Sequence, residues 1–125
     1  MRKIVNINDS WKFIKQDEVN AYNKSFDDTS WETVSVPHTW NAIDGANGFD
    51  FHKGACWYRK EVMVDTLEQG NRVYIEFNGS NSITDVYVNG HHMGQHRGGY
   101  STFRFDITDV VEFGKLNTVS VKVDN

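Results

Sequence analysis

Apolar and polar residues alternate with a period of two along several short segments of the chain. In the segments 72–77, 103–107 and 119–123, every second side chain is apolar. This alternation predicts strands with one face packed against a core and the other exposed to water. Shorter apolar runs predict further strands at 11–14, 33–36, 56–64 and 84–88. No segment keeps a helical period over three turns, so we expect an all-β fold.

Turn residues separate these predicted strands at the short spacing that is typical of sandwiches and barrels. Asn89 and Gly90 form the pair preferred in a two-residue type I′ hairpin, because both positions need a positive φ. The polar stretches 18–30 and 41–54 are predicted to be surface loops. The second holds three glycines among aromatic and charged residues, and binding residues often lie on such loops.

Size and charge narrow the class of protein. A length of 125 residues suits one domain. The 13 basic and 17 acidic side chains are evenly mixed and give a net charge of -4, so we expect no nucleic-acid partner. No apolar run reaches the roughly 18–20 residues of a membrane helix, and the first residues lack an apolar signal core. We expect no membrane insertion, and the compartment, cytoplasmic or periplasmic, stays open.

The chain offers few groups for a metal, a cofactor or nucleophilic chemistry. Its one cysteine, Cys56, lies in an apolar run, where it is either a buried structural thiol or a nucleophile. His92 and His96 would share one face of a strand at a separation of roughly 13 Å, which is too far for one metal ion. A phosphate-binding loop leads into a helix, and no helix is predicted after the glycines at 98 and 99. We predict neither a metal site nor a cofactor.

The segment 36–41 concentrates ring and amide groups directly after a predicted strand. Trp40 offers a flat apolar face to a pyranose ring, while His38 and Asn41 offer hydrogen bonds to its hydroxyl groups. In the structural alternative, Trp40 closes one end of the sandwich and His38 bonds a backbone carbonyl. A second candidate, Arg59, pairs with a carboxylate either inside the domain or across an interface with another domain. The sequence leaves both alternatives open.

A series of motifs resembles the N-terminal domain of glycoside hydrolase family 2, the family of β-galactosidases and β-glucuronidases. The motifs are VPHTWN at 36–41, GACWYRK at 54–60, FNGS at 77–80, VYVNG at 86–90, GQHRGGY at 94–100 and FRFDIT at 103–108. The segments 7–13 and 117–125 are similar to the first and last strands of that domain. The resemblance covers nearly the whole chain and implies a jelly-roll β-sandwich of the galactose-binding-domain type over residues 1–125.

In this family the sugar-binding domain precedes an immunoglobulin-like domain and a (β/α)₈ barrel, and two glutamates of the barrel retain the anomeric configuration. A barrel needs at least roughly 200 residues, so we expect neither it nor its glutamates in this chain. The resemblance implies that the parent's other domains are the partners, and that the β-glycoside is reached through them. Polar residues of the loop 41–54 could then contact sugar at the mouth of the barrel: Asn41, Asp44, Asn47 and Asp50.

Three functions follow from these observations. The first is a non-catalytic domain of a retaining glycosidase, a β-galactosidase in the commonest case, that packs on the barrel and shapes its substrate mouth. The second is an autonomous carbohydrate-binding module, which needs exposed, coplanar aromatic rings. The third is an independent enzyme, for which we find no serine–histidine–acid, paired-carboxylate or zinc motif. We favour the first.

Overall fold

The computed structural model describes residues 4–36, 55–77, 83–97 and 102–124, and these form eight strands and a single 3-10 turn. The elements are β1 (Trp11–Ile14), β2 (Glu32–Val34), β3 (Ala55–Val64), η1 (Thr66–Glu68), β4 (Tyr74–Phe77), β5 (Ile83–Val88), β6 (His91–Arg97), β7 (Phe103–Asp106) and β8 (Lys115–Asp124). The prediction of an all-β sandwich is confirmed. Within the described ranges no helix is long and apolar enough to cross a membrane.

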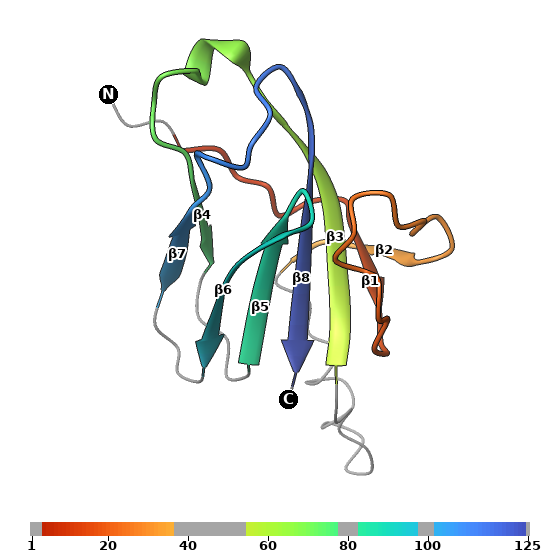
Figure 1. Cartoon of the computed structure of the whole chain (residues 1–125). Coiled ribbons are helices and arrows are strands. Elements are labelled where there is room, and N and C mark those ends of the chain that lie inside the picture. Colours follow the sequence, from red (N-terminus) through yellow and green to blue (C-terminus); the bar gives the residue numbers. More distant parts are fainter. Residues whose placement is uncertain (1–3, 37–54, 78–82, 98–101, 125) are drawn as a thin grey trace.

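The strands form two antiparallel sheets that face each other (Figure 1). The larger sheet has six strands in the order β2-β1-β3-β8-β5-β6, and the smaller pairs β4 with β7. The smaller sheet lies beside β6, at the end of the larger sheet away from β2 (Figure 1). Long β3 and β8 pair over their full length, from Ala55 opposite Asp124 to Val64 opposite Lys115, and form the centre of the larger sheet.

The core lies between the sheets because alternate residues of each strand face inward. One row of the larger sheet runs through Phe13, Tyr58, Val121 and Val86, each opposite the next across neighbouring strands. The smaller sheet contributes Ile75, which is 6% exposed, to the same core. The opposite face of the larger sheet points away from β4 and β7, and we call it the outer face.

The predicted hairpin between β5 and β6 is confirmed. Asn89 and Gly90 have φ values of 51° and 83°, and Val88 pairs directly with His91. The Asn89 side chain donates to Asn117 Oδ1 at 2.8 Å and accepts from the Thr118 amide at 3.0 Å, which joins the hairpin to β8. Asparagine at this position therefore supplies both the turn conformation and the attachment.

A bulge in β6 corrects the expected placement of two histidines. The pairing shifts between Val86 and Tyr87, so that His92 lies opposite Tyr87 while His96 lies opposite Thr84. The extra residue turns His92 to the outer face and His96 to the core, so the expectation that they share a face is wrong. Beyond the bulge, Gly94 packs directly under Phe105 of β7, leaving no room for a side chain.

Candidate functional site

Only one of the predicted site residues lies in the described part of the chain. The six candidates His38, Trp40, Asn41, Asp44, Asn47 and Asp50 belong to 37–54, outside the described residues. Their proposed roles remain predictions. The seventh, Arg59, lies on the outer face of β3 and is only 2% exposed.

Arg59 anchors the segment between β1 and β2. Its Nη1 donates to Asp28 Oδ2 at 2.6 Å and to the Phe26 carbonyl at 2.9 Å, while Nη2 donates to the Asn23 carbonyl at 2.8 Å. Nε donates to the Ala21 carbonyl at 3.0 Å. The guanidinium therefore binds three backbone carbonyls and one carboxylate, which its planar array of five N–H groups allows. Of the two alternatives for Arg59, the structure has the carboxylate inside the domain.

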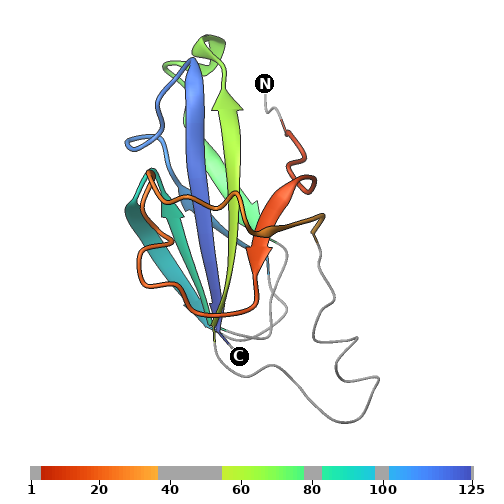
Figure 2. The same ribbon diagram turned by 90° about the vertical axis from the view of Figure 1, so that its right-hand side faces the viewer.

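The segment 18–30 lies at the surface as predicted, but it is fixed to the sheet rather than free. Figure 2 shows it in orange, passing over the strands of the larger sheet. Ala21 is fully buried, and Trp31 packs with it against Trp57 of β3. Asp27 closes a turn by accepting hydrogen bonds from the Thr29 hydroxyl and amide. These hydrogen bonds lower the pKa of the Asp27 carboxyl from 3.8. The segment thereby covers the half of the outer face that carries Arg59.

The other half of the outer face carries a group of aromatic rings around Tyr87. The Tyr87 ring on β5 lies 5.7 Å from Trp57, 5.5 Å from Tyr22 and 4.9 Å from His92, centroid to centroid. Tyr22 comes from the covering segment and is 37% exposed. Desolvation, then the Asp85 carboxylate, then Tyr22 raise the pKa of Tyr87. Tyr87 is thus the shared neighbour of the other three rings, each of which is tilted by 34–46° to it.

Polar side chains border these rings. Asp85 Oδ1 accepts from His92 Nε2 at 2.9 Å and from Gln95 Nε2 at 3.1 Å. Lys122 lies directly opposite Asp85 in β8, with its Nζ 3.7 Å from Asp17 Oδ1. We call the set Tyr22, Asp85, Tyr87, His92, Gln95 and Lys122 the outer-face cluster.

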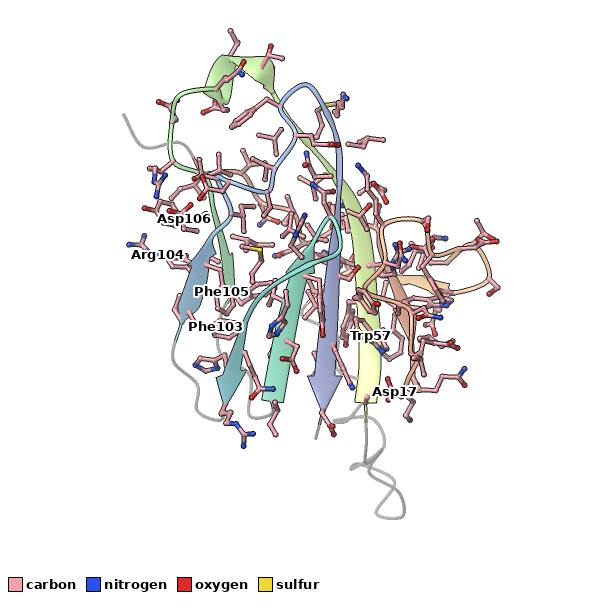
Figure 3. The ribbon with its side chains drawn as sticks, in the orientation of Figure 1. Asp17, Trp57, Phe103, Arg104, Phe105 and Asp106 are labelled. Atoms are coloured by element: carbon pink, nitrogen blue, oxygen red, sulfur yellow. The ribbon has the colours of Figure 1, made fainter. Side chains whose placement is uncertain are left out.

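Trp57 packs beneath Tyr87 and Lys122 of this cluster. Its indole N–H donates to Asp17 at 3.1 Å, and the two side chains lie near the start of β3 in Figure 3. Lys122 Nζ lies 6.0 Å above the ring. Because Trp57 is 2% exposed, Lys122 rather than the indole face meets the solvent.

Cys56 faces the core, where it is fully buried. Desolvation raises the pKa of its thiol to about 12, although Lys15 acts in the opposite direction. A protonated, inaccessible thiol is a poor nucleophile. Of the two roles considered for Cys56, the structure therefore supports the buried structural thiol.

The aromatic platform of a stand-alone binding module does not form from the described tryptophans. Trp11, Trp31 and Trp57 are 3%, 6% and 2% exposed, so their faces pack against other side chains. Trp11 also donates its indole N–H to the Ile7 carbonyl at 2.6 Å. The fourth tryptophan, Trp40, lies outside the described residues.

Comparison with known proteins agrees with this architecture. Residues 4–125 match the family model described as the sugar binding domain of glycosyl hydrolases family 2. The chain belongs to glycoside hydrolase family 2. It is 38% identical to a β-glucuronidase of Formosa agariphila and 39% identical to a β-galactosidase of Thermoanaerobacter pseudethanolicus, with 99% of the chain covered in each case.

Solved structures show the same relationship. A Bacteroides uniformis β-glucuronidase, covalently bound to cyclophellitol-6-carboxylate aziridine, superposes with a TM-score of 0.90 at 35% identity over 95% of this chain. The family 2 domain spans 14% of that structure, and 14% and 17% of the two relatives above. It corresponds to the N-terminal sugar-binding domain of much longer enzymes.

Sequence reasoning did not single out the outer-face cluster of this family 2 domain. One signal was present, since Asp85 and Tyr87 alternate with the buried side of β5, formed by Thr84, Val86 and Val88, and must share a face. The contribution of His92 depends on the bulge, and that of Tyr22 on the covering segment. Neither of these can be read from alternation alone.

Proposed function

We propose that this chain is the non-catalytic N-terminal domain of a retaining β-glycosidase, where it packs on the catalytic barrel and shapes the entrance to the substrate site. The observation that carries the proposal is coverage: the family model matches residues 4–125, yet the chain spans only 14–17% of the relatives named above. The remaining length of such enzymes accommodates a barrel of about 250 residues. The partners of this domain are therefore the other domains of its parent.

The proposed substrate is a β-glycoside that the parent hydrolyses. The names of the two relatives divide between β-glucuronidase and β-galactosidase, so the β-galactosidase predicted from the sequence is one of two supported activities. The choice between a galactoside and a glucuronide lies with barrel residues that this chain does not contain. The function of a stand-alone binding module is not favoured, because three of the four tryptophans of this chain are buried.

The proposal is tested by assaying the purified 125-residue chain with para-nitrophenyl β-galactoside and β-glucuronide. We expect no hydrolysis above the uncatalysed rate, because the two carboxylates that a retaining mechanism requires, about 5–5.5 Å apart, belong to the barrel. Hydrolysis that follows the chain through two chromatographic steps and scales with its concentration would show an independent enzyme and overturn the proposal.

A further inference from the structure

The two central strands of the larger sheet project beyond their neighbours at one end. β1 pairs with β3 only as far as Arg59, and β5 pairs with β8 only from Val119 onward. Residues 61–64 and 115–118 pair with each other, so among the described strands this end is a two-stranded ribbon. We call it the projecting ribbon. Figure 1 shows it next to η1, at the end of β8 opposite Asp124.

The projecting ribbon is apolar on both faces. Val62 and Val64 pack against the core. Met63 and Leu116, which lie directly opposite each other, alternate with them onto the outer face and are 57% and 54% exposed. A strand face that meets water normally carries polar side chains, and strand propensity favours threonine or valine over methionine or leucine. Neither the core nor the local backbone therefore explains this pair.

Coverage of the outer face stops just before Met63 and Leu116. Arg59 lies under the segment 18–30, and Ser120 opposite it is 0% exposed. In the next pair, the Thr118 hydroxyl donates to Glu61 Oε1 at 2.8 Å. Beyond it the exposed fraction of both side chains rises above one half, so none of the described segments shields them. An apolar centre with a charged rim has the composition of a protein interface.

We infer that Met63 and Leu116 contact a second domain of the same parent enzyme, which presents an apolar surface to them. The inference rests on the proposed function and adds to it the surface through which another domain is held. Methionine suits such a contact because its unbranched side chain adapts to the shape of the facing surface. Leu67 of η1, 83% exposed, adds an apolar side chain at the same end of the sheet.

The size of the pair favours a domain of the same chain over a second copy. The exposed parts of two such side chains amount to on the order of 100–200 Å². A stable complex of separate molecules buries about 800 Å² per partner. A domain on the same chain is present at a high effective concentration, so a smaller contact contributes to holding it. Enzymes of this kind have the length for such domains, since the chain spans only 14–17% of the relatives named above.

Oxidation by hydrogen peroxide measures the exposure of Met63 directly, because accessible thioethers react first. Mass spectrometry would compare the isolated 125-residue chain with an exchanged enzyme, in which residues 4–125 replace the matching segment of the Thermoanaerobacter pseudethanolicus β-galactosidase. We expect Met63 to be oxidised about tenfold more slowly in the exchanged enzyme. Met93, which packs against the core, is the internal reference and should react at the same rate in both.

The double substitution Met63→Thr and Leu116→Thr tests the contribution of the contact, because threonine keeps the strand propensity and removes apolar surface. In the isolated chain the urea midpoint should not change, since both side chains are more than half exposed. In the exchanged enzyme the half-life of activity at elevated temperature should shorten about tenfold. Val19→Thr is the matched control: Val19 is 82% exposed on the covering segment, and its replacement should leave the half-life unchanged.

Equal rates of Met63 oxidation in the isolated chain and in an active exchanged enzyme would overturn the inference and leave the proposed function intact. An unchanged half-life of the double variant, or an equal loss from Val19→Thr, would overturn it too. Dimerisation of the isolated chain that the double variant abolishes, measured by sedimentation, would identify a second copy as the occupant and refute the contact with another domain. An exchanged enzyme without activity would refute the proposed function, and the inference would fall with it.

Discussion

Replacing Arg59 with alanine is expected to release the segment 18–30 from the larger sheet. Arg59 is 2% exposed, and its partner Asp28 has a side chain that is 23% exposed. The substitution removes four hydrogen bonds and leaves one carboxylate and three carbonyls without their donor. Breaking a buried ion pair from one side typically costs about 3–5 kcal/mol.

That loss is large for a domain of this size, whose free energy of unfolding is expected to be about 5–15 kcal/mol. It corresponds to a decrease in melting temperature of roughly 10–25 °C. Urea titration followed by circular dichroism measures the global loss. Hydrogen exchange of the amides in 18–30 tests whether this segment opens first, as its attachment to Arg59 predicts.

Arg104→Ala is the matched control. Arg104 is exposed on β7, with its guanidinium 4.8 Å from the Tyr74 ring, and the pair is expected to contribute about 0.5–1 kcal/mol. Figure 3 shows Arg104 on the sheet opposite the one that carries Trp57. If Arg59→Ala destabilises the domain by no more than Arg104→Ala does, the anchoring role of Arg59 is refuted. Should Arg59→Ala not fold, Asp28→Asn gives a milder test, with an expected loss of about 1–2 kcal/mol.

Three further predictions follow from the core and the turns. Gly94→Ala should destabilise the domain by about 1–3 kcal/mol in urea titrations, because the added Cβ overlaps the Phe105 ring. Phe105→Leu in the same chain should restore part of that loss, whereas strictly additive losses from the two substitutions would argue against the contact. The thiol of Cys56 should resist alkylation in the native chain at about pH 8 and react on unfolding, whereas rapid native labelling would contradict its burial and raised pKa. Asp27 and Asp106 each accept hydrogen bonds from a threonine two residues later, which lower their pKa values from 3.8. The stability that these two carboxylates contribute is therefore present above pH 3.8, and it is lost as the pH falls through their lower pKa values in the folded state. Urea midpoints that do not fall between neutral pH and about pH 2.5 would contradict it.

Local rules predicted most of the strands because alternation is a local property. Alternation alone missed the start of β8, of which the family resemblance covered only the part from residue 117. Residues 115–118 show little alternation, yet they form a strand because β3 offers them partners from Glu61 to Val64. Long-range pairing of this kind overrides local preference. The jelly-roll assignment came from the series of family motifs and not from the periodicity.

The candidate site was less predictable than the fold. The partner of Arg59 lies 31 residues away, and its other acceptors are backbone carbonyls, which carry no residue-specific signal. The bulge that directs His92 to the outer face depends on the pairing of β6 with β5. Side chains on paired strands can be grouped by face from the sequence, but contacts that cross from a loop to a sheet require the three-dimensional structure.

The most direct test of the central claim is a domain exchange. Residues 4–125 would replace the matching segment of the Thermoanaerobacter pseudethanolicus β-galactosidase, which is 39% identical, and a deletion of that segment would serve as the control. If this chain is a functional scaffold domain, we expect the exchanged enzyme to hydrolyse β-galactosides at a rate well above that of the deletion. An exchanged enzyme that is folded but no more active than the deletion would contradict the account, as would a deletion as active as the intact enzyme.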